Sequence, residues 1–229
     1  NEYFISSDVA SIIQHTKNIL YLDDNEIISF QKDGYKVTSL ENELIIDKKI
    51  ELIDIDIETI EKGNFDYFML KEIYEQPQAF INSIRGRVDY KNNKIKLGGI
   101  DDHALGIINS DMIYITACGT SWHSALIGSY ILENLLDIPV KVEYASEFRY
   151  RKTSVTANST VIVISQSGET ADTLAALKKA KMIGAKTLGV VNVVGSSVAR
   201  EADCGVYIHA GPEIGVASTK AFTCQVTAL

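Results

Sequence analysis

Six consecutive residues, Ser165–Thr170, combine three hydroxyl side chains, one amide side chain and a glycine. They follow an apolar run and precede a helical pattern, which places them in a loop between a predicted strand and a predicted helix. Free N–H groups at a helix start attract anions, and hydroxyl groups donate hydrogen bonds to phosphate oxygens. Gly168 allows the backbone to come close to a ligand. The run therefore indicates a phosphate-binding loop, although it contains no lysine or arginine.

A second loop of similar position, Cys118–Ser121, also lies between a predicted strand and a predicted helix. Ligands of doubly wound α/β sheets bind at the carboxyl ends of strands, near the point where the strand order reverses. Two polar loops of this kind therefore favour a ligand site. The simpler explanation, that these hydroxyl groups only form turns and helix caps, stays open at this point.

The remaining charged candidates have structural explanations. Glu72 and Glu75 could form a catalytic carboxylate pair, but three positions apart on a helix they are expected on its solvated face. Lys220 opposes the dipole of the helix that it begins, so it either reaches an anion or is solvated, and we favour solvation. The charged and aromatic run Glu147–Arg151 fits either an interface or a solvated loop.

Neither the cysteines nor the histidines are spaced like metal ligands. The three cysteines are far apart and form no CxxC pair, which argues against a disulfide framework or a zinc site. Cys118 follows a predicted buried strand, so a packed thiol is favoured over a nucleophile. His123 and His209 are expected to have surface or structural roles. We expect no metal and no cofactor.

From residue 110 onward, apolar strands alternate with helical patterns. This rhythm predicts an α/β fold with a parallel five-stranded sheet flanked by helices. Gly184 is expected to end one of the helices. The predicted strands are Met112–Thr116, Val140–Tyr144, Thr160–Ile164, Thr187–Val191 and Val206–His209, and the predicted helices are Ser121–Leu136, Thr170–Ile183 and Ser197–Ala202.

The first 97 residues predict a small β-rich segment and linker helices. Pro77 is expected to break the helix predicted for residues 65–84, or to begin a new one, because proline lacks the N–H group. The other predicted elements are a helix over 8–17 capped by Asp8, a hairpin of 19–22 with 27–30, a strand pair of 35–40 with 44–47, an extended linker over 48–63 and a hairpin over 90–97.

Composition excludes some classes of protein. The 229 residues carry a net charge of −8, which argues against general nucleic-acid binding. No apolar run reaches the roughly 20 residues that span a bilayer, and no signal peptide is recognisable, so a cytoplasmic setting is expected. The chain begins at Asn1 and ends within an apolar, helix-like run, so we expect a piece of a longer protein.

Several motifs together resemble one family. The chain is similar to the first sugar-isomerase (SIS) domain of the glutamine–fructose-6-phosphate aminotransferases, preceded by the end of their glutaminase domain. The motifs that carry the resemblance are Ser7–Ala10, Leu20–Asp24, Lys71–Pro77, Ala117–Ser121, Ala145–Arg151, Ser165–Leu174 and Glu213–Thr223.

The resemblance implies a domain order and a set of ligand residues. Residues 1–40 would be the tail of the glutaminase domain, 41–90 a linker with helices, and 91–229 the first SIS domain. The implied substrate-binding residues are Thr120, Ser121, Ser165, Gln166, Ser167, Thr170, Val216 and Ser218.

The resemblance also implies a reaction, in which fructose 6-phosphate and glutamine become glucosamine 6-phosphate and glutamate during amino-sugar biosynthesis. The family's catalytic cysteine, base, histidine and lysine would lie outside this chain, so no catalytic residue is expected within it. Fructose 6-phosphate or glucose 6-phosphate would be the ligand, and a homodimer through SIS domains the assembly. The alternatives are a SIS-type sugar-phosphate sensor, usually preceded by a helix-turn-helix, and a sugar-phosphate isomerase.

Overall fold

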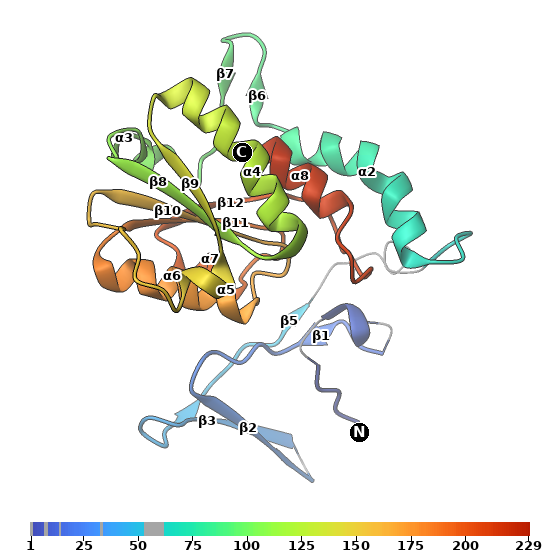
Figure 1. The fold of residues 1–229 in the computed structure, drawn as a ribbon. Coiled ribbons are helices and arrows are strands. Elements are labelled where there is room, and N and C mark those ends of the chain that lie inside the picture. Colours follow the sequence, from blue (N-terminus) through green and yellow to red (C-terminus); the bar gives the residue numbers. More distant parts are fainter. Residues whose placement is uncertain (1, 7–8, 14, 33, 53–61) are drawn as a thin grey trace. The chain divides into compact units, whose positions relative to one another are not determined.

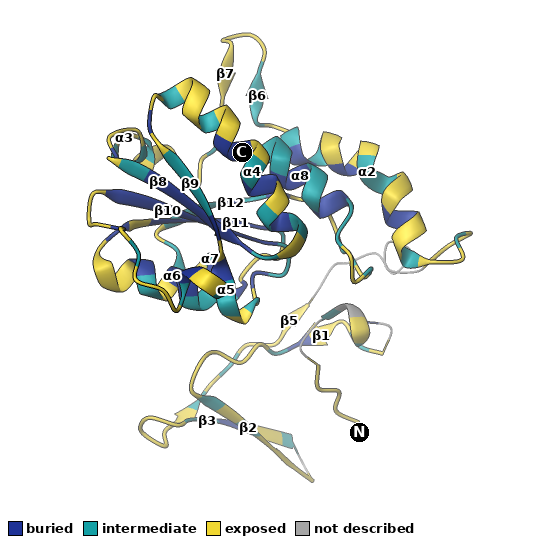
Figure 2. Cartoon of the chain, viewed as in Figure 1, coloured by how far each residue is buried: buried dark blue, intermediate teal, exposed yellow. Residues whose placement is uncertain are grey.

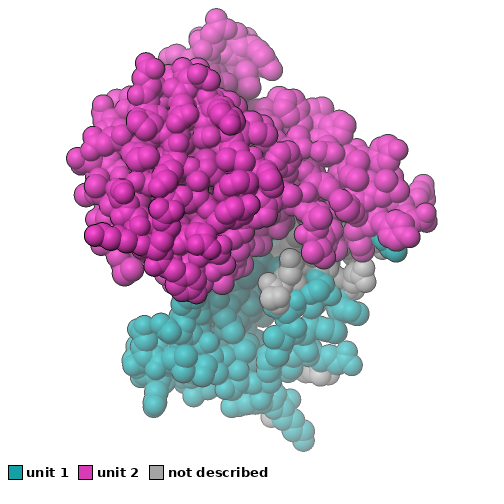
Figure 3. All heavy atoms as spheres, in the orientation of Figure 1, with its two compact units in different colours: residues 1–63 teal, residues 64–229 magenta. Residues whose placement is uncertain are grey.

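The computed structural model divides the chain into two compact units, residues 1–63 and residues 64–229 (Figure 3). Each unit has its own set of strands. The residues that the structure describes are 2–6, 9–13, 15–32, 34–52 and 62–229.

The first unit is built from short antiparallel strands. Strands β2, β3 and β4 form one sheet in that order, and β1 pairs with β5. Lys48 lies 2.6 Å from Asp23 and 2.7 Å from Glu26, which ties the segment after β4 to the residues around the start of β2. The elements are the 3₁₀ turn η1 (Val9–Ser11), β1 (Asn18–Ile19), β2 (Glu26–Gln31), β3 (Gly34–Ser39), β4 (Ile45–Ile46) and β5 (Glu51–Leu52).

Two predictions for this unit need correction. The hairpin of 19–22 with 27–30 is wrong, because β1 pairs with β5 while β2 pairs with β3. Only two residues separate β2 from β3 in the sequence, which is the length of the tightest hairpin connection. β2 therefore pairs with β3 rather than with residues 19–22. The described part of the helix predicted over 8–17 is only the turn η1; its expected cap, Asp8, lies outside the described residues.

The pairing of β3 with β4 confirms the predicted strand pair of 35–40 with 44–47. Most of the predicted linker, residues 53–61, lies outside the described residues.

The second unit is a three-layer α/β fold (Figure 1). Its five-stranded sheet has the order β12-β11-β10-β8-β9, and all four pairings are parallel, as predicted. Gly184 ends α6 in a left-handed conformation, with a φ of 88°, also as predicted. The elements are α2 (Phe68–Ile84), β6 (Val88–Asp89), β7 (Lys94–Ile95), η2 (Asp101–His103), α3 (Ala104–Ile108), β8 (Met112–Ala117), α4 (Gly119–Leu136), β9 (Val140–Tyr144), α5 (Ala145–Phe148), β10 (Ser159–Ser165), α6 (Ala171–Ile183), β11 (Lys186–Val191), α7 (Ser197–Glu201), β12 (Cys204–Tyr207) and α8 (Lys220–Ala228).

Successive side chains of the central strands enter opposite cores, because strand side chains alternate between faces. Figure 2 shows the central strands β8 and β10 coloured as buried along most of their length. Ile162 and Ile164 of β10 pack with α4, α8 and Ala79 of α2. Val161 and Val163 of the same strand pack with α5, α6 and α7. Both faces of the sheet are therefore covered, which explains why its central strands are apolar almost throughout.

The predicted break at Pro77 is wrong, because α2 runs without interruption from Phe68 to Ile84. Pro77 cannot donate a hydrogen bond to the carbonyl group of Ile73, four residues earlier. The side chain of Gln76 does so instead, with its Nε2 atom 3.1 Å from that oxygen. A neighbouring side chain thus satisfies the carbonyl group that the proline leaves unpaired. The hairpin predicted over 90–97 is confirmed by the pairing of β6 with β7, although its first strand begins at Val88.

Aromatic side chains pack against one another near the first turns of α4 and α5. Trp122, the single tryptophan of the chain, stacks on Tyr144 with ring centroids 4.2 Å apart. Phe148 is fully buried and meets Tyr114 edge-on at 6.3 Å. Its burial rules out a wholly solvated loop for the run Glu147–Arg151.

Replacing Phe148 by alanine should lower the free energy of unfolding of the second unit by about 3–5 kcal/mol, because it leaves a cavity in a closed core. The matched control is Tyr150→Ala, two residues later, where the side chain is 78% exposed. We expect a change within about 0.5 kcal/mol there. Urea unfolding followed by tryptophan fluorescence measures both variants, and equal losses would contradict the packing described.

Candidate functional site

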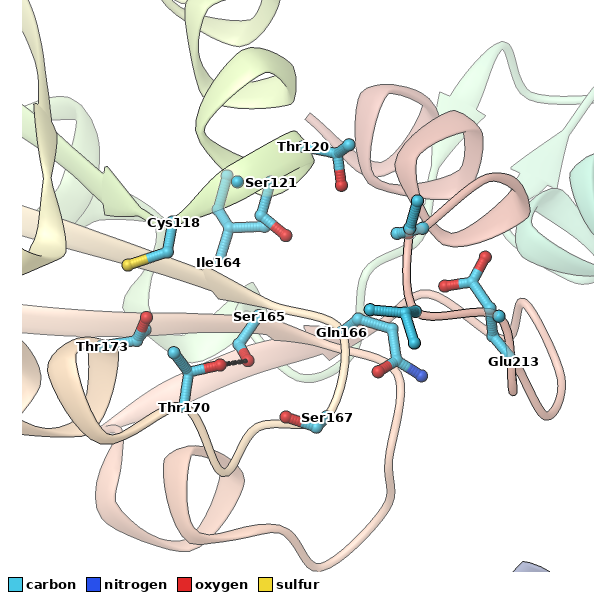
Figure 4. Close-up of a pocket in the computed structure, with 15 residues that line it drawn as sticks. Cys118, Thr120, Ser121, Ile164, Ser165, Gln166, Ser167, Thr170, Thr173 and Glu213 are labelled. Carbon is cyan, nitrogen blue, oxygen red and sulfur yellow. Dashed lines mark hydrogen bonds between the residues drawn. The ribbon is translucent and has the colours of Figure 1, made fainter. Parts of the chain in front are cut away.

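A cavity of about 350 Å³ opens at the carboxyl ends of β8 and β10 (Figure 4). Its walls are the loop and first turn of α4, the loop between β10 and α6, and the segment before α8. The lining residues are Cys118, Gly119, Thr120, Ser121, Ile164, Ser165, Gln166, Ser167, Thr170, Thr173, Glu213, Gly215, Val216, Ala217 and Ser218.

The sheet topology explains this location. From β8 the chain moves to one edge to form β9, and then to the other side to form β10, β11 and β12. The strand order therefore reverses between β8 and β10, where the loops after two neighbouring parallel strands separate and leave a crevice. The two loops predicted from the sequence to bind a ligand, Cys118–Ser121 and Ser165–Thr170, lie at this point.

The loop Ser165–Thr170 is held in a tight turn by its own hydroxyl groups. Gly168 has a φ of 70°, and its N–H group donates to Ser165 Oγ at 3.0 Å. Ser165 Oγ also lies 3.0 Å from Thr170 Oγ1. The Gly168 carbonyl oxygen accepts from the N–H group of Val198 at 3.0 Å, which ties the turn to α7. The turn-forming explanation therefore holds for Ser165.

Helix capping does not account for the polar loops. α6 begins after Thr170 and α4 after Cys118, and neither of these N-cap side chains bonds to its helix. Both helices begin at the cavity wall, so N–H groups of their first turns and the positive ends of their dipoles are available to a bound anion.

Several hydroxyl groups are oriented as donors. Gln225 Nε2 donates to Ser121 Oγ at 2.9 Å, and the N–H group of Glu169 donates to Ser167 Oγ at 3.1 Å. Each serine oxygen thus already accepts one hydrogen bond, and its own O–H hydrogen remains for a ligand. Thr173 Oγ1 is buried without a hydrogen-bond partner among the described residues. Figure 4 shows the Thr120 and Ser121 oxygens directed toward the open centre.

Glu213 is the one charged side chain among the described residues that line the cavity. Its Oε1 atom accepts hydrogen bonds from the N–H groups of Thr219 at 2.8 Å and Ala221 at 3.2 Å. The carboxyl group therefore caps α8, where a negative charge is favoured by the helix dipole. Backbone amides and hydroxyl groups form the rest of the polar lining, and the binding of an anion by them stays a prediction.

The segment before α8 forms the outer wall. Val216 is fully exposed, while Ser218 Oγ is buried without a partner among the described residues. This wall adds backbone groups and one hydroxyl group to the lining of the cavity.

All eight residues predicted to bind a ligand line this one cavity. Their contact with a ligand stays a prediction. Sequence reasoning missed Thr173 and Gln225. Thr173 lies three positions after Thr170, a spacing that places both on one helical face and could have revealed it. Gln225 lies 104 residues from Ser121, so no local pattern could have linked them.

Two predictions about charged residues are wrong. Glu72 is 2% exposed rather than solvated, and its Oε1 atom accepts from the N–H groups of Ile214 and Gly215. Lys220 is also buried, with its Nζ atom 2.6 Å from Glu75 Oε2, so this lysine reaches an anion of the protein. The partners are about 145 residues apart in sequence, beyond the reach of helical periodicity.

Two of the thiols lie in surroundings that favour the neutral form. Burial raises the pKa of Cys224 and of Cys204. Among the described residues, no group of three or more His, Cys, Asp and Glu side chains is placed to hold a metal ion. Nor does any helix in the described part of the chain combine the length and apolar character needed to cross a membrane.

Residues 106–229 match the family model of the SIS domain. The chain belongs to the SIS domain family. A solved structure of the C-terminal domain of glucosamine-fructose-6-phosphate aminotransferase from Francisella tularensis is similar, with a TM-score of 0.67 and 43% identity, over 73% of this chain and 46% of that one. Tagatose-6-phosphate ketose/aldose isomerase from Escherichia coli shares the fold, with a TM-score of 0.57 at 18% identity, over 71% of this chain and 46% of that one.

Similarity to longer proteins extends over the whole chain. It is 53% identical to the isomerizing glutamine–fructose-6-phosphate aminotransferase of Chlorobaculum tepidum, over 100% of this chain and 37% of that protein. It is 45% identical to the isomerizing glutamine–fructose-6-phosphate aminotransferase 2 of Homo sapiens, over 100% of this chain and 34% of that protein. The chain thus spans about a third of the length of these curated relatives.

Replacing Gly168 by alanine should destabilise the second unit by about 3 kcal/mol, because a Cβ atom there combines a left-handed φ with overpacking. The added carbon would lie 2.0 Å from Ser196 Oγ, which belongs to a buried side chain. Gly195→Ala is the matched control, with a φ of 73° but open space around the added carbon. It should cost only about 1 kcal/mol. Urea unfolding compares the two, and equal costs would contradict the tight turn.

Proposed function

We propose that this chain is the sugar-phosphate-binding part of an enzyme that converts fructose 6-phosphate and glutamine to glucosamine 6-phosphate and glutamate. The observation that supports this most directly is the cavity at the start of α4 and α6, where two uncapped helices and several donor hydroxyl groups meet. The names of the full-length relatives supply the substrate and the reaction.

The phosphate group is held at the inner end of the cavity. The first turns of α4 and α6 supply N–H groups, while Ser121, Ser167 and Thr170 supply hydroxyl groups. The fixed dipoles of N–H and O–H groups stabilise the charge of a bound phosphate dianion. Phosphate binding therefore does not require a lysine or arginine, and none is found among the described residues that line the cavity.

The sugar extends toward the outer wall. Val216 and Ser218 belong to this wall and line the cavity, so the Val216 backbone and the Ser218 hydroxyl group are the groups that face the sugar in this proposal. Neutral hydrogen-bonding groups of this kind recognise sugar hydroxyl groups. In this proposal the inner end of the cavity binds the phosphate group, and the outer wall binds the sugar.

The reaction itself requires groups that the cavity lacks among its described residues. A ketose–aldose shift needs a base that moves a proton between neighbouring carbons. Glu213, the single carboxyl group there, is engaged in capping α8. The chain therefore binds the substrate, while residues elsewhere in the longer protein carry out the proton transfers and amination.

Similarity over the full chain also supports a domain assignment within that longer protein. Residues 1–40 form the end of a glutaminase domain, 41–90 a linker and 91–229 the first SIS domain. The second compact unit begins at Asn64, so the linker contributes α2 to the unit that contains the cavity. The longer protein is a cytoplasmic homodimer that associates through its SIS domains.

Fructose 6-phosphate or glucose 6-phosphate should raise the melting temperature of the chain. At a ligand concentration of about 100 times Kd, the stabilisation is about 2.7 kcal/mol, which corresponds to a shift of several degrees for a unit of this size. Ser167→Ala combined with Thr170→Ala should abolish the shift, because the phosphate loses two donors. Differential scanning calorimetry measures it.

The matched control replaces two hydroxyl groups outside the cavity, Thr153→Ala with Ser154→Ala, and should keep the full shift. An unmutated chain that shows no shift with either sugar phosphate would contradict a preformed phosphate site. Inorganic phosphate at the same concentration separates binding of the phosphate group from recognition of the sugar.

The chain by itself should form no glucosamine 6-phosphate from fructose 6-phosphate, whether glutamine or ammonia supplies the nitrogen. Chromatographic detection of the amino sugar over several hours tests this, with a full-length aminotransferase as the positive control. Any turnover above the background without protein would show that a catalytic group lies within the chain.

A further inference from the structure

Helix α2 is joined by polar contacts to the wall segment before α8 and to α8 itself, although about 140 residues separate them. Thr223 Oγ1 donates to Gln76 Oε1 at 2.6 Å. Lys220 Nζ donates to Glu75 Oε2 at 2.6 Å. The third contact, made by Glu72, is the one that reaches the cavity wall itself. In Figure 1, α2 and α8 lie side by side.

Glu72 binds two consecutive backbone N–H groups of the wall. Its Oε1 atom lies 2.5 Å from the nitrogen of Ile214 and 2.9 Å from that of Gly215. The side chain is 2% exposed, so water does not compete for these bonds. Hydrogen bonds to a desolvated carboxyl group are among the stronger ones in proteins. They fix the backbone directly before Val216 and Ser218.

The close approach depends on glycine. A Cβ atom on Gly215 would lie 2.5 Å from Glu72 Oε2 and 3.5 Å from the Cα atom of Met69. Glu72 Oε2 is itself buried and has no hydrogen-bond partner among the described residues. Burying the Glu72 carboxyl group with its Oε2 atom unpaired costs desolvation free energy. The two hydrogen bonds that Oε1 accepts offset this cost.

We propose that Glu72 is a positioning residue for the sugar-phosphate site, which holds the segment Ile214–Ser218 at the distance from the phosphate loop that the sugar requires. It touches no ligand and acts through the backbone of Gly215. Since it concerns the same cavity, this role rests on the proposed function. It also makes α2 a structural part of the site, because the outer wall is anchored to that helix.

Isothermal titration with fructose 6-phosphate tests the role on the whole chain. Glu72→Ala should weaken binding by about tenfold, because the ligand must then order the wall segment itself. Glu72→Gln retains an acceptor oxygen and should stay within about threefold of the unmutated chain. Gln78→Ala, on an exposed face of the same helix, is the matched control and should leave Kd unchanged.

Amide hydrogen exchange supplies a readout that needs no ligand. The N–H groups of Ile214 and Gly215 should lose protection in Glu72→Ala and keep it in Glu72→Gln, while α6 stays protected in both. If the unmutated chain bound no sugar phosphate, the proposed function would fail, and these two amides would still decide whether Glu72 holds the wall. Lost protection with an unchanged Kd would overturn the positioning role.

A variant on the other side of the contact guards against misfolding of Glu72→Ala. Gly215→Ala forces the wall away from Glu72 and should weaken binding by about tenfold. Gly98→Ala, where the added carbon meets open space, should not. In the double variant with Glu72→Ala, the alanine at 215 should add little further loss, because the clashing oxygen is gone. Additive losses would contradict the proposed contact.

Discussion

The parallel pairing of β8 with β10 is the constraint on which the rest of the second unit depends. Because Ala117 pairs with Ile164, both strands end at the same edge, and the chain must leave them in different directions. α4 and α6 therefore begin next to each other, with their N-terminal ends toward one space. The cavity and its supply of N–H groups both follow from this register, before any side chain is considered.

Side chains then determine which ligands the cavity would favour. A lysine or arginine in the cavity would bind any anion by charge. Neutral donors in fixed positions require a ligand with several acceptor oxygens in a matching arrangement, which favours selectivity over raw attraction. The protein carries a net charge of −8 and so gains nothing from general electrostatic attraction of such a ligand. Buried supports such as Gln225, rather than charges, keep the donors in place.

Local patterns in the sequence predicted the five strands and the helices α4, α6 and α7, because apolar runs and helical spacing are properties of neighbouring residues. The four-residue helix α5 was not predicted, since it is too short to show a helical period. The same reasoning located both cavity loops, since parallel strands bring their carboxyl ends together. It failed where residues far apart in sequence meet. Glu72 and Lys220 looked like solvated charges because nothing near them reveals α8 or α2 as the covering element. At Pro77 the general rule was right about the missing hydrogen bond, but a side chain of the preceding residue supplied it.

The stacking of Trp122 on Tyr144 has a practical consequence. Trp122 is the single tryptophan of the chain, and it belongs to the first turn of α4, next to Thr120 and Ser121. When tryptophan is excited selectively, its fluorescence therefore reports only on the second unit, from a position beside the cavity. Tyrosine emission comes from both units. Comparing the two signals during one unfolding experiment separates the melting of the β-rich segment from that of the sheet, without a label or a truncated chain.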